Sequence, residues 1–220
     1  AVLIIVMSVM NGFRSELLGK ILGFNGHLFV TGGVTDGAEP AAAVQRILKV
    51  PGVIQAAPVI EAQAIAMGPT QITGAIVRGL NPRDLADTPV VSGHLTQGSL
   101  KDYGTGEYGG NVVVIGERLA EQIGVKAGDT VSLISPSGSA TAFGGTPTQK
   151  TYTVGATFVA GMSQYDQAYI FMPLTQAQLF FGREGSVDAI EVRVADPDKA
   201  GEMKAAVNRA AGPAGLVTDW

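Results

Sequence analysis

The sequence contains no cysteine, and this absence removes several kinds of site. Without thiols the chain has no disulfide framework, no thiolate metal site and no cysteine nucleophile. Charge is also scarce: only 15% of the residues are charged, the net charge is −4, and no two basic residues are adjacent. The basic patch that binds nucleic acid is therefore missing, and we expect no nucleic-acid partner. A hydrophobic content of 46% argues equally against intrinsic disorder.

Sequence patterns of catalysis are missing as well. His27 and His94 are isolated, and neither a Walker A sequence nor a G-x-S-x-G elbow occurs. The stretch "GTGEYG" (104–109) matches the dinucleotide pattern but comes before an expected strand, whereas phosphate binding needs it between a strand and a helix. We interpret Tyr165, Asp166 and Tyr169 as turn and strand-edge residues. The sequence therefore predicts no enzyme active site, no cofactor and no metal.

The first ten residues, "AVLIIVMSVM", hold Ser8 as their only polar side chain. A membrane-spanning helix needs about 20 apolar residues, so this run is too short to span. It has neither the charged start nor the cleavage site of a signal peptide. Two interpretations stay open: a buried core segment, or the trailing half of a transmembrane helix. Apolar residues at helical spacing then predict an amphipathic helix that ends around 23–26.

Two segments far apart in the chain resemble each other. The first runs from "GHLFV" through the helical "AAAVQRILKV" to "VIQAAPVI", and the second from "AIEVRV" through "ADPDKAGEMKAAVNRAAG" to "PAGLVTDW". Pro40 and Pro197 suit the first turn of each helix, and Asp196 can cap the second. Two such strand–helix–strand units predict a ferredoxin-like α+β layer, to which we assign further strands at 62–67 and 73–80.

The stretch between the two units is predicted to be an inserted, β-rich subdomain at about 89–185. It contains the strand "NVVVIG", the helix "ERLAEQI" ended by Gly124, and an alternating strand around 152–158. Within it, the sixteen residues "SPSGSATAFGGTPTQK" (135–150) join two expected strands. Hairpin loops take about 2–5 residues, so a loop this long is either functional or disordered.

The whole chain resembles one family of membrane proteins. The stretch "VMSVMNGFRSELLGKILGFNGHLFV" is similar to the segment that leaves the first transmembrane helix in the permeases of lipoprotein-releasing (Lol) ABC transporters, the LolC/LolE family. The similarity continues through "VVVIGERLAEQIGVKAGDTVSLISPSG", "YIFMPLTQAQLFF" and "DAIEVRVADPDKA". The stretch "GMSQYDQAYIFMPL" resembles LolE, while the loop resembles LolC, a combination typical of the LolF type.

The resemblance implies a MacB-like periplasmic domain with the following parts. Residues 1–23 would be the end of the first transmembrane helix and a connecting amphipathic helix. Residues 24–88 and 186–220 would form a discontinuous, ferredoxin-like (Porter) subdomain. Residues 89–185 would form a Sabre-like subdomain that carries the loop 135–150.

The resemblance also implies a role for the loop. In family members that recruit a chaperone, a proline-bounded loop called the Hook enters the periplasmic lipoprotein chaperone LolA, and a nearby surface called the Pad adds contacts. The Hook here would comprise Pro136, Ser137, Gly138, Ser139, Ala140, Thr141, Ala142, Phe143, Gly144, Gly145, Thr146 and Pro147. It is one residue shorter than in LolC, and Phe143 is its only large apolar side chain. Gln149 and Lys150 match Pad positions, while Ser132 stands where the family usually has arginine.

Further partners follow from the resemblance. It implies an inner-membrane protein with this region in the periplasm, a cytoplasmic ATPase subunit (LolD), a second permease copy or paralogue, and a lipoprotein substrate. Val6, Val9 and Met10 match positions that contact the acyl chains of the lipoprotein. Two alternatives remain: a MacB- or FtsX-type permease domain in efflux or in regulating cell-wall hydrolases, and a soluble enzyme with a buried N-terminus.

Overall fold

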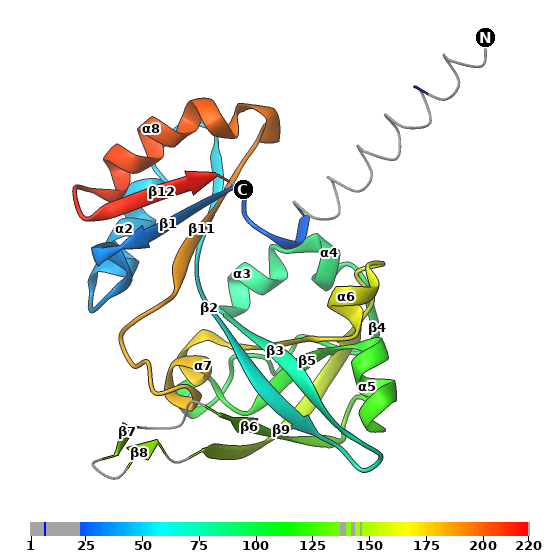
Figure 1. Cartoon of the computed structure of the whole chain (residues 1–220). Coiled ribbons are helices and arrows are strands. Elements are labelled where there is room, and N and C mark those ends of the chain that lie inside the picture. The colour runs from blue at the N-terminus through cyan, green and yellow to red at the C-terminus, as the bar shows by residue number, and fades with distance from the viewer. Residues whose placement is uncertain (1–6, 8–22, 137–139, 142–143, 146, 220) are drawn as a thin grey trace.

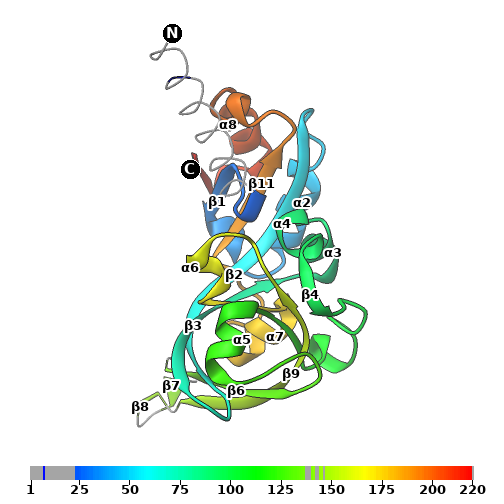
Figure 2. The ribbon, with the colours of Figure 1, turned by 90° about the vertical axis from the view of Figure 1, so that its right-hand side faces the viewer.

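The computed structural model describes residues 7, 23–136, 140–141, 144–145 and 147–219, and they form two connected halves (Figure 1). One half is a four-stranded sheet with two helices, and the other is built around a ring of six strands. A single long strand, β2 (Val53–Met67), runs through both halves, as Figure 2 shows. The expected mixture of α and β structure is thus present.

The first half has the strand order of a ferredoxin-like fold. Its strands are β1 (Leu28–Gly32), the first part of β2, β11 (Ala189–Val194) and β12 (Gly215–Asp219). They lie in the order β12-β1-β11-β2, and every neighbouring pair is antiparallel. Numbered as they occur in this half, the strands follow the order 4-1-3-2. The two similar units of the sequence therefore interlock: β1 of the first lies between both strands of the second.

Two helices cover one face of this sheet, α2 (Glu39–Ile47) and α8 (Ala200–Ala211). Pro40 lies in the first turn of α2, as predicted. Pro197 begins a short 3-10 turn, η3 (Pro197–Lys199), which leads into α8, and the Asp196 carboxylate accepts a hydrogen bond from the Asp198 amide at 3.2 Å. The predicted cap exists, but it caps the 3-10 turn that precedes the α-helix.

The second half is a closed barrel. Its six strands are the second part of β2, β3 (Ile72–Leu80), β10 (Tyr169–Pro173), β5 (Val112–Gly116), β9 (Thr148–Phe158) and β6 (Thr130–Ser135). Strand β6 pairs with both β9 and β2, and these two pairings close the ring. Strand β4 (Leu95–Gly98) extends the sheet beyond β9. The interior is filled by apolar side chains from the strands and from the helices α5 (Glu117–Ile123) and α7 (Leu174–Phe180).

The structure corrects the assignment of residues 60–80 to the ferredoxin-like layer. Strand β2 pairs with β11 only as far as Val59, and from Ile60 onward it pairs with β3. The stretches 62–67 and 73–80 are therefore barrel strands, and Ala64, Ala66, Ala75 and Val77 pack inside the barrel. The physical reason is that β2 is 15 residues long and serves two sheets in succession, which local apolar alternation does not reveal.

A separate apolar cluster fills the junction between the two halves. Ala57 and Val59 of β2 meet barrel residues such as Val114, Phe158 and Phe171 there. Three short helices complete this cluster: α3 (Pro82–Ala86), α4 (Pro89–Ser92) and α6 (Ser163–Asp166). The sheet of the first half is thus covered by helices on one face and faces the junction with the other.

Candidate functional site

The predicted loop grows out of the β6–β9 hairpin at one end of the barrel. The two strands pair from Thr130↔Thr153 to Ser135↔Thr148, so the loop begins at a regular antiparallel ladder. Beyond it, β7 (Ala140–Thr141) and β8 (Gly144–Gly145) form a second, two-residue ladder within the loop. Figure 1 shows them projecting at the end of the barrel remote from the ferredoxin-like half. The loop is therefore an extension of a hairpin whose base is fixed.

Several of the predicted site residues lie outside the described part of the chain. In the Hook these are Ser137, Gly138, Ser139, Ala142, Phe143 and Thr146, and at the N-terminus they are Val6, Val9 and Met10. The two prolines that bound the Hook, Pro136 and Pro147, are both exposed. Their roles and those of the remaining Hook residues stay predictions.

The two predicted Pad residues face opposite sides of β9. Gln149 is exposed, as is Thr151, which shares a hydrogen bond of 3.0 Å with Ser132 on the neighbouring strand. Lys150 is half-buried on the other face, where its Nζ donates to Gln176 Oε1 of α7 at 2.7 Å and lies 5.4 Å from the centre of the Tyr152 ring. Successive side chains of a strand point to opposite faces, so one flat partner surface cannot contact both residues in this arrangement.

The outer face of the hairpin continues onto β2, and the residues that pair there are uncharged. Ile65, Ile134 and Gln149 lie side by side across three strands, next to the row Met67, Ser132 and Thr151. An apolar cavity of about 330 Å³ opens beside this row. Its lining is formed by Gln63, Ala64, Ile65, Gly74, Ala75, Ile76, Pro136 and Ala168. Exposed apolar surface thus adjoins the root of the loop.

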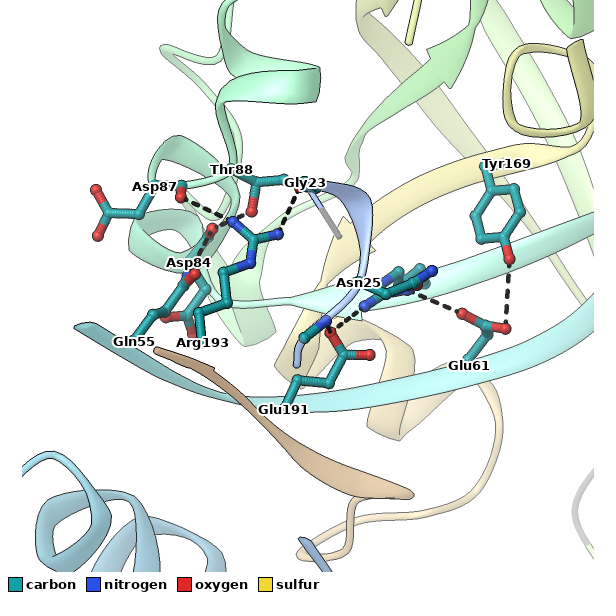
Figure 3. Close-up of polar contacts among 12 residues, drawn as sticks. Gly23, Asn25, Gln55, Glu61, Asp84, Asp87, Thr88, Tyr169, Glu191 and Arg193 are labelled. Atoms are coloured by element: carbon teal, nitrogen blue, oxygen red, sulfur yellow. Dashed lines mark hydrogen bonds and ion pairs between the residues drawn. The ribbon is translucent and has the colours of Figure 1, made fainter. Parts of the chain in front are cut away.

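A second candidate site, which sequence reasoning missed, lies at the junction (Figure 3). Arg78 of β3 is only 2% exposed, and its Nη1 donates to Glu61 Oε2 at 3.2 Å and to Asn25 Oδ1 at 3.0 Å. Its Nη2 forms an ion pair with Glu191 of β11. Burial raises the pKa of Glu61, an effect that the neighbouring Arg78 partly offsets. The available sequence signal was charge inside apolar strands: one charged residue in "AIVRGL" and two in "AIEVRV".

Arg193, two residues after Glu191 on β11, forms a second group of polar contacts. Its Nη2 donates to the Gly23 carbonyl at 2.7 Å and its Nη1 to the Asp87 carbonyl at 3.4 Å (Figure 3). Gln55 donates to the Asp84 carbonyl at 3.2 Å, and burial raises the pKa of the Asp84 carboxyl. These contacts tie the chain at 23–26 and the α3–α4 region to the ferredoxin-like sheet.

The stretches whose sequence could suggest a nucleotide or acid–base site make structural contacts. The glycines of "GTGEYG" lie in a turn before β5, and a Cβ at Gly104 would lie 2.1 Å from the Pro82 side chain. The Asp166 carboxylate is buried and accepts from the Ala160 amide at 2.6 Å, and Tyr165 packs on Phe24 with ring centres 3.8 Å apart.

Among the described residues no cluster of three or more histidine or acidic side chains could hold a metal ion. Every helix in these described ranges is too short or too polar to span a bilayer.

Comparisons with curated proteins give relatives of one kind. The lipoprotein-releasing system transmembrane protein LolC of Neisseria meningitidis serogroup B is 27% identical over 223 residues, covering 99% of this chain. Its namesake from Xylella fastidiosa strain Temecula1 is 29% identical over 220 residues, covering all of this chain. The chain spans about half of each relative, 52% of its length. The resemblance to the LolC/LolE family seen in the sequence is confirmed.

Two solved structures share this fold. The extracellular domain of the ABC-type transporter YknZ from Gram-positive bacteria gives a TM-score of 0.58 at 14% identity, covering 87% of this chain and 99% of that one. The periplasmic region of MacB from Actinobacillus actinomycetemcomitans gives 0.57 at 12% identity, covering 93% and 94%. Residues 1–210 match the model of the family described as the MacB-like periplasmic core domain. The chain therefore belongs to the family of MacB-like periplasmic core domains.

Proposed function

We propose that this chain is the periplasmic domain of an inner-membrane ABC transporter permease that extracts lipoproteins and passes them to a periplasmic chaperone of the LolA type. Similarity to LolC over the whole chain supports this function. Energy would come from ATP hydrolysed by a separate cytoplasmic subunit (LolD), and a second permease copy or paralogue would complete the transporter. Val6, Val9 and Met10 would contact the acyl chains of the cargo.

The observation that carries the proposal is the proline-bounded loop on a fixed hairpin base. From Pro136 to Pro147 the sequence has no charged side chain and one large apolar group, Phe143. Such a segment can enter an apolar cavity without burying a charge, and its prolines reduce the entropy lost on binding. The regular pairing of β6 with β9 supports the loop at its root.

The remaining contacts to the chaperone would come from the outer face of the β6–β9 hairpin. Gln149 belongs to this face, together with Ser132 and Thr151. Lys150 was assigned to the Pad by resemblance, but its ammonium group is bound to Gln176 on the other face. Lys150 would have to leave Gln176 to reach the chaperone, so we give Gln149 the larger share of the Pad contact.

A second candidate function is that of a MacB- or FtsX-type permease domain. The structural similarity to the MacB and YknZ domains favours it as strongly as the fold alone can. The two functions differ in their partner, because only a lipoprotein-releasing permease should bind a LolA-type chaperone. Binding of that chaperone to the isolated domain therefore separates them.

The loop is tested by the substitution Phe143→Asp. Burying one phenylalanine is worth about 1.5–3 kcal/mol, so the variant should bind the chaperone at least about tenfold more weakly. A buried, unpaired aspartate adds to the loss. Calorimetric titration of the chaperone into the domain measures the affinity, and a melting curve of the same sample checks the fold.

A matched control introduces the same kind of charge elsewhere. Ile54 is 63% exposed on β2 in the ferredoxin-like half, and Ile54→Asp should leave chaperone binding unchanged. Unchanged binding by Phe143→Asp would exclude the loop as the docking element. A large drop in its melting temperature would instead mean that Phe143 belongs to a hydrophobic core.

A further inference from the structure

Arg78 lies where the two halves of the molecule separate. Strand β2 pairs with β11 at Ala57↔Glu191 and with β3 at Glu61↔Arg78, so its partner changes within four residues. The guanidinium of Arg78 binds Glu191 as well as Glu61, so it bridges the two strands at this fork. One side chain thus links the barrel strand β3 to the ferredoxin-like strand β11.

The chain at 23–26 is fastened to the same fork. Asn25 accepts from Arg78, and the Gly26 amide donates to Glu191 Oε2 at 3.0 Å. Phe24 lies under Arg78, whose guanidinium carbon is 5.5 Å from the ring centre. The segment that follows the first 22 residues is therefore held by both halves at once.

Packing around Gly26 shows how closely this segment approaches the fork. A Cβ at this position would lie 2.9 Å from Glu191 Cβ and 3.1 Å from the Val192 amide nitrogen. No side chain fits there unless the segment moves away from β11. The hydrogen bonds of Asn25 and Gly26 are thus accompanied by direct backbone contact.

Charge explains why an arginine is needed at the centre. Glu61 and Glu191 both approach the same point, and without a cation between them the two carboxylates would repel each other in a partly desolvated site. Arginine offers a rigid fork of donors that can serve two carboxylates and an amide oxygen together, whereas lysine offers a single point charge. Arg78 uses this arrangement of donors, because it binds both carboxylates and the Asn25 amide oxygen.

We propose that Arg78, Glu61, Glu191 and Asn25 form a coupling joint, in which Arg78 is the positioning residue that holds segment 23–26 and the two halves in one relative orientation. A movement of the segment is then transmitted to both halves instead of being absorbed by a loop. This role rests on the proposed function in one respect, namely that the segment leads to the membrane.

The joint is tested by measuring the orientation of the two halves directly. Because the chain has no cysteine, Glu121→Cys on α5 and Glu202→Cys on α8, both exposed, give two unique positions for spin labels. Pulsed electron resonance then gives the distribution of distances between the halves. We expect one narrow distribution in the parent protein and a clearly broader one in Arg78→Met.

Two further variants control this measurement. Arg83→Met also removes an ion-paired arginine, but Arg83 is 92% exposed and lies outside the fork, so the distribution should stay narrow. Arg78→Lys keeps a charge without the fork of donors and should broaden the distribution partly. An unchanged width in folded Arg78→Met overturns the proposal. If Arg78→Met does not fold, an unchanged width in Arg78→Lys overturns it.

Hydrogen exchange tests the attachment of the segment. The Gly26 amide donates to Glu191, so its exchange should be about tenfold faster in Arg78→Met, because local opening becomes easier when Glu191 loses its partner. The Arg83→Met control should exchange at the parent rate. An unaltered Gly26 rate in Arg78→Met would show that the segment is not held through Arg78.

Transport in the complete permease with its ATPase separates this proposal from the proposed function. In Arg78→Met we expect chaperone binding and ATP hydrolysis to persist while lipoprotein release falls about tenfold. The reason is that the variant no longer holds the two halves in one relative orientation, whereas its binding sites are unchanged. Normal release together with a broadened distribution would overturn the coupling role. Failure of the parent permease to bind the chaperone would refute the proposed function and leave the joint measurements standing.

Discussion

One buried polar side chain joins the start of the first strand to the end of β11. His27 is buried immediately before β1, and its Nδ1 accepts a hydrogen bond from the Val194 amide at 3.0 Å. An isolated histidine is usually a surface residue, and the sequence offered no reason to bury this one. Its partner is a backbone amide 167 residues away, which explains why no local pattern revealed it.

The burial of His27 predicts acid sensitivity. Burial and the positive charge of Arg193 lower the pKa of His27, so the unfolded chain binds more protons than the folded one between this lowered pKa and the ordinary value near 6.5. Stability should therefore fall as the pH decreases through the ordinary value near 6.5 and toward the lowered pKa of the folded protein. In His27→Gln this loss of stability at low pH should disappear, because glutamine can accept the hydrogen bond without titrating. Urea unfolding at several pH values measures the effect.

The other histidine supplies the control for that experiment. His94 is exposed and its ring contacts the Pro89 carbonyl, so His94→Gln tests removal of a histidine outside the core. It should retain the acid slope of the parent protein. If the free energy of unfolding depends on pH in the same way in all three proteins, His27 does not cause the acid sensitivity.

At the scale of single elements, helix ends followed the sequence closely. The helix "ERLAEQI" ends at Gly124 as predicted, and Gly124 takes the left-handed conformation with φ of 78°. Its amide donates to the Ala120 carbonyl at 2.9 Å, which satisfies one of the free carbonyl groups at the helix end. Glycine is favoured here because the left-handed conformation places no Cβ against the backbone.

Gly124→Ala is predicted to destabilise the protein by more than the usual cost of a left-handed alanine, about 1–2 kcal/mol. The extra cost is steric, because a Cβ would lie 2.6 Å from Thr70 Cγ2. Gly128→Ala is the matched control: its φ of 95° is also positive, but nothing lies within 4 Å of the added Cβ. In thermal unfolding, Gly124→Ala should therefore have a lower melting temperature than Gly128→Ala. Equal losses would exclude the contact with Thr70 as a cause.

Strand β2 is the element that the sequence described least well. The sequence predicts two strands here, at 53–60 and 62–67, whereas the structure has one strand from Val53 to Met67. In the structure Pro58 pairs with Ile190 of β11 on one side, and β3 begins to pair only at Ile60 on the other. The missing amide of the proline therefore removes no bond from the β3 ladder.

At the scale of the whole molecule, one shared strand should make unfolding cooperative. Because β2 belongs to both sheets and Arg78 links them, neither half can lose its structure without exposing part of the other. We predict a single calorimetric transition with equal calorimetric and van't Hoff enthalpies.

Ile190→Ala tests this cooperativity from the ferredoxin-like half. Ile190 is fully buried there, and its truncation should cost about 2–5 kcal/mol and lower the temperature of the whole transition. Circular dichroism and the fluorescence of barrel tyrosines such as Tyr152 should report the same midpoint. Two separate transitions, of which only one responds to Ile190→Ala, would contradict a shared unit.

The sequence by itself determined the fold class, the two strand–helix–strand units, the helix ends at Gly124 and Pro40, and the position of the loop between two strands. These features depend on contacts between near neighbours along the chain, on turn residues and on apolar periodicity. It also carried the family resemblance, through stretches spread along the whole chain.

Only the tertiary structure decided which sheet received residues 60–80, which face of β9 carries Lys150, and which charges meet at Arg78. Each of these depends on pairing between strands distant in the chain, as with Glu191 and Ala57, or on the side of a strand that a neighbour covers. In the sequence this buried ion pair leaves a single charge, Arg78, in the apolar strand β3 and two charges, Glu191 and Arg193, in β11. Its meaning appears when folding brings the two strands to the same fork, where burial makes the pairing obligatory.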